Sequence, residues 1–103
     1  MPNVVVRYKT KPERADENQA LVEKVFAELN GMGDTGFSYM SMRLEDGVSF
    51  VHVVVEHGSG DTVSLADLPA FQAFTAEIAE RCDEPPVAVG GRIVGSHGFG
   101  LQT

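Results

Sequence analysis

The spacing of hydrophobic and polar positions changes along the chain between two periods, which predicts both strands and helices. Residues 4–8 form a β-branched apolar run that predicts a strand. A T-x-x-E capping box at residues 10–13, with proline in the first turn, then predicts the start of a helix. Five apolar side chains follow at spacings of three and four residues, as in an amphipathic helix: Leu21, Val22, Val25, Phe26 and Leu29. Asn30-Gly31 is expected to end this helix.

The middle of the chain is typical of a β-hairpin. Residues 37–45 and 48–56 are strand-like and are joined by Asp46-Gly47, a strong signal for a two-residue type I′ turn. This turn fixes a register in which the following residues face each other: Arg43 and Phe50, Ser41 and His52, Tyr39 and Val54, Phe37 and Glu56.

A second helix is predicted after the hairpin, with Asp67 as N-cap and Pro69 in the first turn. Its apolar stripe comprises Leu68, Phe71, Phe74, Ile78 and Cys82. Prolines at 85 and 86 are expected to stop the helix before a last strand over residues 87–94. The order β-α-β-β-α-β predicts one α+β domain over residues 1–103, with a ferredoxin-like four-stranded antiparallel sheet.

Both faces of the predicted sheet carry apolar side chains. Residues 4–6 and 53–55 are valine at consecutive positions, so neither face is patterned for water. Helices on one face would leave the other uncovered, and in a chain of 103 residues the expected cover is a second copy. We therefore expect a homodimer.

Charge and cysteine content narrow the possible environments and partners. A net charge of −7 disfavours nucleic-acid binding, because an acidic surface repels phosphates. No apolar run approaches the roughly 20 residues that span a bilayer, and the N-terminal residues lack the pattern of a secretory signal. A single cysteine, Cys82, allows no internal disulfide, and we expect a cytoplasmic protein.

Candidate chemistry centres on the stretch SFVHVVVEH, residues 49–57. His52 and Glu56 share a strand face but lie about 13 Å apart, too far to bind one metal ion. We therefore expect no metal site. The face that holds His52 also carries Tyr39, Ser41 and Arg43. The alternate face carries only apolar side chains and is expected to be plain core: Met40, Met42, Leu44, Val51, Val53 and Val55.

Two interpretations of the His52 face remain open. If it lines a pocket, His52 and Tyr39 are candidate catalytic residues that orient a ligand or move a proton. The candidate ligand-binding residues would then be Arg43, Ser41, Phe50 and Phe74. If the face is instead a dimer contact, the same side chains are structural partners in a non-catalytic homodimer. His57 and His97 lie beside glycines and are expected to be exposed.

The chain also resembles the antibiotic-biosynthesis-monooxygenase-like proteins. The resemblance lies in the first strand, the K-P-E helix start, the D-G hairpin and the segment LPAFQAFTAEI before the last strand. It implies a dimeric α+β barrel and a cofactor-independent oxygenase, or a binder of a small aromatic or apolar molecule. Haem-degrading members use a histidine on the second helix, with an asparagine on the first strand and a tryptophan nearby. This chain has no tryptophan and no histidine between His57 and His97, and its first-strand asparagine is Asn3 at the strand's mouth. We therefore expect neither haem degradation nor a cofactor.

Overall fold

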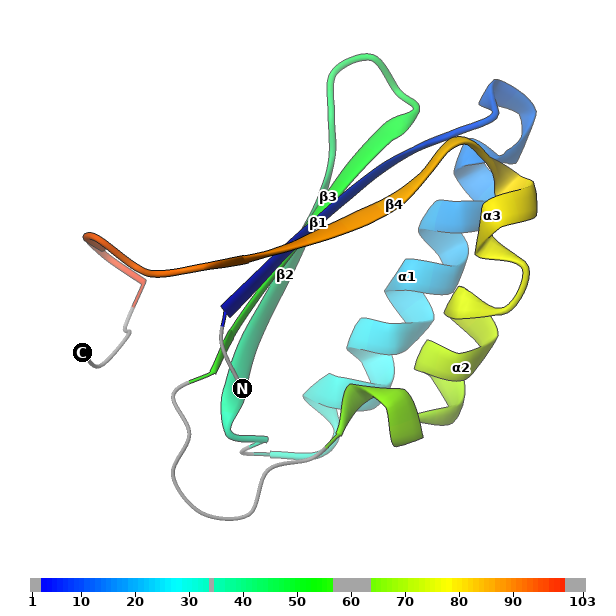
Figure 1. Ribbon diagram of the computed structural model, residues 1–103. Coiled ribbons are helices and arrows are strands. Elements are labelled where there is room, and N and C mark those ends of the chain that lie inside the picture. Colours follow the sequence, from blue (N-terminus) through cyan, green and yellow to red (C-terminus); the bar gives the residue numbers. More distant parts are fainter. Residues whose placement is uncertain (1–2, 34, 57–63, 100–103) are drawn as a thin grey trace.

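Four strands form one antiparallel sheet, and the helices lie on one of its faces (Figure 1). The structure is a computed structural model that describes residues 3–33, 35–56 and 64–99. Its strands are β1 (Asn3–Thr10), β2 (Phe37–Arg43), β3 (Ser49–Glu56) and β4 (Cys82–Gly91), and they lie in the order β2-β3-β1-β4. The predicted ferredoxin-like α+β fold is confirmed.

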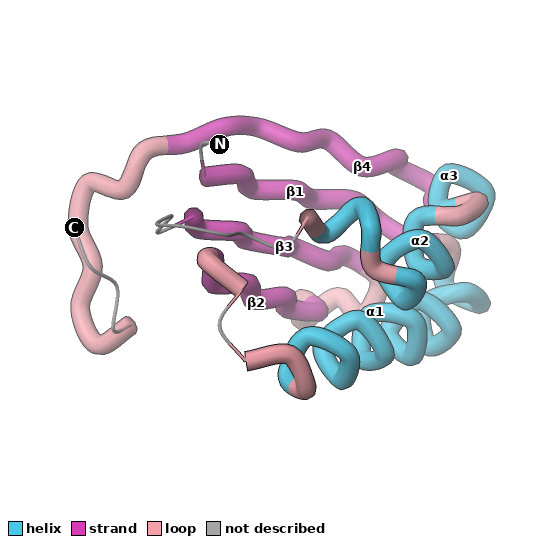
Figure 2. Tube along the Cα trace, turned by 90° about the horizontal axis from the view of Figure 1, so that it is seen from below, coloured by secondary structure: helices cyan, strands magenta, loops and turns pink. Residues whose placement is uncertain are grey.

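The helical layer contains one long helix and several short ones. They are η1 (Pro12–Arg14), α1 (Ala15–Asn30), η2 (Leu65–Asp67), α2 (Pro69–Thr75) and α3 (Ile78–Arg81). Figure 2 shows α1 and α2 side by side over the sheet, so the molecule has two layers. None of the described helices is long and apolar enough to cross a membrane.

The face of the sheet that carries His52 is the face that meets the helices. Tyr8, Phe50 and His52 are only 4%, 2% and 3% exposed. They pack in the core with Val25 of α1 and Phe74 of α2. The interpretation of this face as a dimer contact is therefore wrong, because helices of the same chain already cover it.

The opposite face, predicted as plain core, is open in the single chain. Met42 is 49% exposed and Val89 is 58% exposed. The register places Met40, Val53, Val5 and Val89 side by side in one row across all four strands. The alternation of the strands was predicted correctly, but the assignment of this face to the core was wrong because the helices cover the other one.

The predicted second helix is broken into two pieces. Glu77 adopts a left-handed conformation, with φ of 58°, between α2 and α3. The Arg81 guanidinium donates hydrogen bonds to the carbonyl oxygens of Phe74 and Ala76. These carbonyls end α2, so a side chain binds them where a continuing helix would have used backbone N–H groups. Cys82 is buried as predicted, but it begins β4 instead of ending a helix.

The ends of two other elements also differ from the prediction. Thr10 does not cap a helix: it ends β1, is fully buried, and donates its hydroxyl hydrogen bond to the Val48 carbonyl oxygen at 3.2 Å. Pro12 instead begins the short helix η1. The last strand starts at Cys82 and ends at Gly91, so Pro85 and Pro86 lie within it. Strand β4 is an edge strand, where a missing N–H is tolerated.

The hairpin has the predicted register but a different turn. Arg43 faces Phe50 and Ser41 faces His52, as expected. Gly47 has φ of 79°, whereas Asp46 does not have positive φ, so the turn is not type I′. The Asp46 carboxylate accepts hydrogen bonds from the backbone N–H groups of Val48 and Ser49. The Asp46 side chain thus stabilises a loop that is longer than the predicted two-residue turn. The number of residues between the paired strand positions is the predicted one, so the register is unchanged.

Candidate functional site

His52 lies at the centre of β3 with both ring nitrogens in hydrogen-bonding contact. Its Nε2 is 2.8 Å from the hydroxyl oxygen of Tyr8 on β1. Its Nδ1 is 2.7 Å from the hydroxyl oxygen of Tyr39 on β2. The Ser41 hydroxyl lies farther from Nε2, at 3.4 Å. Three adjacent strands therefore place a histidine between two tyrosines, and the predicted register explains how Ser41 and Tyr39 reach it.

The hydrogen-bond network continues into the helices. Asn18 of α1 is fully buried, and its Nδ2 donates to the Tyr8 hydroxyl oxygen at 2.9 Å. Arg81 of α3 is 2% exposed, and its Nε donates to Asn18 Oδ1 at 3.2 Å. Sequence reasoning missed Tyr8, Asn18 and Arg81. A signal for Asn18 existed, because it lies four residues before Val22 on the buried stripe of α1.

Burial shifts the pKa values of His52, Tyr8 and Tyr39 further toward their neutral forms. Removal from water lowers the pKa of His52 to about 4. Burial likewise raises the pKa of Tyr8, and the hydrogen bond from Asn18 only partly opposes this. Burial also raises the pKa of Tyr39. A neutral imidazole accepts a hydrogen bond at one ring nitrogen and donates one from the other. Between two phenols it can therefore accept from one tyrosine and donate to the other.

Phenylalanine rings pack against both His52 and Tyr8. The Phe74 ring stacks on His52 with centroids 5.4 Å apart, and the Phe50 ring stacks on Tyr8 at the same distance. Both phenylalanines are at most 5% exposed. The structure therefore places Phe74, a candidate ligand-binding residue, in the core against the His52 ring.

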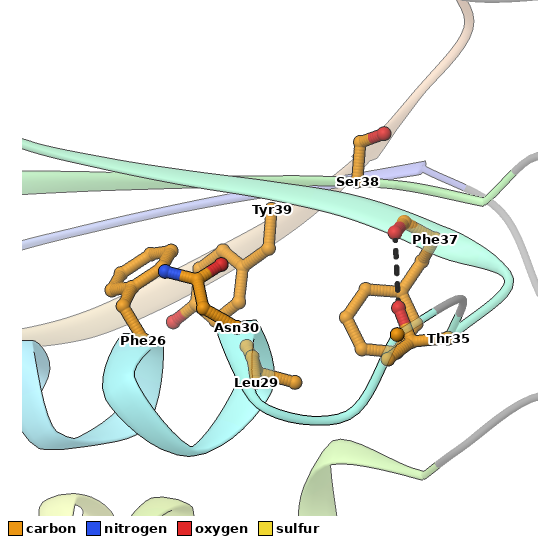
Figure 3. A pocket seen from close by; sticks show the side chains of 8 residues that line it. Phe26, Leu29, Asn30, Thr35, Phe37, Ser38 and Tyr39 are labelled. Atoms are coloured by element: carbon orange, nitrogen blue, oxygen red, sulfur yellow. Dashed lines mark hydrogen bonds between the residues drawn. The ribbon is translucent and has the colours of Figure 1, made fainter.

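A hollow of about 280 Å³ opens between the C-terminal part of α1 and β2 (Figure 3). Its side-chain walls include Phe26, Leu29, Asn30, Phe37 and Tyr39. The rings of Phe26 and Tyr39 pack with centroids 4.7 Å apart. An apolar cavity of about 150 Å³ suffices for benzene, so this hollow has room for one or two rings.

A second hollow of about 240 Å³ shares Phe26 with the first. Ser41, Arg43 and Phe50 line it, so these candidate ligand-binding residues do meet a cavity. Arg43 is already engaged, because its Nη1 donates to Asp16 and Gln19 of α1. An anionic ligand would have to compete with Asp16 for this guanidinium.

Metal-binding residues do not cluster in the described part of the chain. No group of three histidine, cysteine, aspartate or glutamate side chains among these residues is placed to hold a metal ion. His97 is exposed in the C-terminal segment, as predicted. His57 lies outside the described residues.

Several solved structures of low sequence identity resemble this chain in fold. The Rv0793 protein of Mycobacterium tuberculosis has a TM-score of 0.71 at 16% identity, covering 91% of this chain and 95% of its own. An antibiotic biosynthesis monooxygenase has a TM-score of 0.70 at 17% identity, covering 92% of this chain and 100% of its own. A conserved protein from Methanosarcina mazei has a TM-score of 0.63 at 18% identity, covering 87% of this chain and 89% of its own.

These likenesses confirm the predicted resemblance at the level of fold. The chain has the fold of antibiotic biosynthesis monooxygenase-like proteins. No protein-family model matches the sequence, and no curated protein matches it. The chemistry of this chain therefore has to be argued from its own residues.

Proposed function

We propose that the protein binds a small aromatic molecule in the hollow beside Tyr39 and acts on it without a cofactor. The observation that carries this proposal is the position of Tyr39. Its hydroxyl is held by buried His52 at 2.7 Å, and its half-buried ring forms part of the hollow's wall. The walls combine aromatic rings with a few polar side chains, including Asn30 and Thr35, and small-molecule sites use such polar groups to orient a ligand.

The reaction that fits a monooxygenase-like fold is oxygenation of an electron-rich ring. A ring methylene next to a carbonyl can lose a proton to solvent, and the resulting anion reacts with O2 directly to give a peroxide that takes a proton back from solvent. In the overall change, the methylene becomes a carbonyl, one oxygen atom enters the product, and the other leaves as water with the two hydrogens. Tyr39 would hold the substrate oxygen during this change, and His52 would hold Tyr39.

We also propose that two copies assemble through the open sheet face. The row formed by Met40, Val53, Val5 and Val89 is apolar from one edge of the sheet to the other. Exposed apolar surface of this extent marks an interaction site, and a twofold contact would pair the row with itself. Ultracentrifugation should return about twice the 11.1 kDa chain mass. Val89→Asp should give monomers, whereas Ala20→Asp, on the exposed side of α1, should leave the dimer unchanged.

Binding can be tested by NMR titration with one- and two-ring aromatic ketones. Tyr39→Phe should weaken binding about two- to tenfold, because a net hydrogen bond contributes roughly 0.5–1.5 kcal/mol. Thr75→Val, which removes the hydroxyl of an exposed residue of α2, is the matched control and should bind like the wild type. Oxygen consumption with a bound ketone then tests the reaction, and binding without consumption would restrict the function to ligand binding.

The alternative function is a non-catalytic homodimer in which the His52 network only stabilises the core. Its supporting observation is that His52 is itself 3% exposed and has contacts at both ring nitrogens. In that case no aromatic ligand would bind near Tyr39, and Tyr39→Phe would change only stability. The cytoplasmic location, expected from the single cysteine, stays a prediction.

A further inference from the structure

The donor and the acceptor of each hydrogen bond in the network around His52 can be assigned from the chemistry of the side chains. Arg81 can only donate hydrogen bonds, so Asn18 Oδ1 must be the acceptor of the contact at 3.2 Å. This contact fixes the orientation of the Asn18 amide, and its Nδ2 then donates to the Tyr8 hydroxyl oxygen at 2.9 Å. Tyr8 thus receives one hydrogen bond and has a single proton to give.

The Tyr8 proton fixes the tautomer of His52. Nε2 lies 2.8 Å from the Tyr8 hydroxyl oxygen and accepts that proton. Ser41, 3.4 Å from Nε2, can also donate to this nitrogen, which is consistent with the same assignment. A neutral imidazole carries one proton, so it lies on Nδ1 and is donated to the Tyr39 hydroxyl oxygen at 2.7 Å.

Tyr39 is the last member of the chain, and its own proton remains to be donated. The Tyr39 side chain lies on the hollow side of β2, between Phe26 and Phe37, whereas Ser38 points to the opposite side (Figure 3). The described hydrogen bonds give Tyr39 an incoming donor in His52 but no acceptor for its hydroxyl proton. An acceptor atom of a ligand in the hollow would complete the chain.

Arg81 supplies a charge at the inner end of this network. It is 2% exposed, and it makes no ion pair within the described residues. A guanidinium stays charged in proteins, so it polarises the neutral groups that follow it. Successive hydrogen bonds in a chain strengthen one another when all donate in the same direction, as they do here.

We infer that Arg81, Asn18, Tyr8 and His52 are positioning residues that make Tyr39 a hydrogen-bond donor toward the hollow. Resting on the proposed function, this assigns the ligand class: a ring that presents an acceptor oxygen, such as a carbonyl or a phenolate, at Tyr39. A ring that presents only an N–H at that point is disfavoured, because two donors would meet.

Three probes of nearly equal size test the selectivity. 1-Indanone presents an acceptor oxygen, indole presents an N–H donor, and indane presents neither. The wild type should bind 1-indanone about two- to tenfold more tightly than indole. Tyr39→Phe should abolish the difference, because it leaves the ring and removes the donor.

Asn18→Asp should reverse the chain with little change in shape. The introduced carboxylate accepts from Arg81 and also from the Tyr8 hydroxyl, so the Tyr8 proton turns away from His52. His52 then carries its proton on Nε2, its Nδ1 accepts from Tyr39, and the Tyr39 oxygen is free to accept from the ligand. This variant should prefer indole over 1-indanone, whereas Asn18→Leu should weaken the preference without reversing it.

The tautomer can be measured in the wild type without any ligand. The ¹⁵N chemical shifts of the His52 ring, assigned by their loss in His52→Gln, distinguish the protonated nitrogen from the unprotonated one. A proton on Nε2 in the wild type would overturn the inference whatever the protein binds. A proton on Nδ1 with no binding of any probe would overturn the proposed function and the ligand class, while the direction of the chain would stand. An unreversed preference in folded Asn18→Asp would overturn the role of Asn18.

Discussion

Lowering the pH should destabilise the protein through His52 in a defined range. The pKa of this histidine is about 4 in the folded chain, against an ordinary value of 6.5, because burial disfavours the charged imidazolium. Between these two values the unfolded chain binds a proton that the folded chain does not bind. The free energy of unfolding therefore falls as the pH drops from 6.5 toward 4. The contribution is fully present above pH 6.5, and its loss levels off below pH 4.

The size of the effect follows from the difference between the two pKa values. One pKa unit corresponds to about 1.4 kcal/mol, so the full cost is roughly 3 kcal/mol at pH 4. About 2 kcal/mol of this should already be lost at pH 5. Small domains have a total stability of about 5–15 kcal/mol, so the loss is large enough to measure by urea unfolding.

His52→Gln separates this contribution from the titration of the carboxylates. Glutamine can form hydrogen bonds but has no proton to gain, and both proteins keep the same 15 acidic side chains. The free energy of unfolding should fall by about 2 kcal/mol more in the wild type than in the variant between pH 7 and pH 5. The measurement needs one fixed protein concentration, because the proposed dimer would contribute to stability. Parallel pH profiles of the two proteins would refute the assignment of His52 as a buried neutral histidine.

Three further predictions concern the turn, the helix break and the cysteine. Gly47→Ala should cost about 1 kcal/mol in thermal unfolding because its φ is 79°, whereas Gly91→Ala, also with nothing near a new Cβ, should cost less; equal costs would contradict this. Glu77→Gly should stabilise the chain by about 0.5–1 kcal/mol, because glycine adopts its left-handed conformation without strain, and a loss of stability would argue against a strained break. Cys82 should react with a thiol reagent far more slowly in the folded than in the urea-unfolded protein, because the residue is 8% exposed and burial raises the pKa of its thiol; similar rates would contradict its burial.

The sequence predicted the strands and their pairing because both depend on local pattern. Alternation gave the two faces of the hairpin, and the spacing around Asp46-Gly47 gave the register even though the turn type was wrong. The break between α2 and α3 could not be predicted in this way. It depends on Arg81 binding the carbonyl groups of the preceding turns, a contact made only once the chain is folded.

The assignment of the two sheet faces failed for a related reason. Polarity suggested that the face with His52, Tyr39 and Ser41 was a pocket or an interface, and that the alternate face was the core. A polar side chain is stable in a core when its hydrogen bonds are satisfied, and the partners of His52 come from the two strands on either side of it. Two further members, Asn18 and Arg81, come from helices distant in sequence. Counting polar residues on a face cannot reveal such pairing.

Strand β2 belongs to both of the surfaces to which we assign a role. Side chains of neighbouring residues point to opposite faces, so Tyr39 lines the hollow while Met40 lies on the open apolar face. β2 is also an edge strand, held on one side by β3 alone. A partner chain packed over Met40 and Val53 would restrain the backbone that positions Tyr39. The proposed dimer would then do more than cover apolar surface, because it would stabilise the edge of the ligand site against fraying.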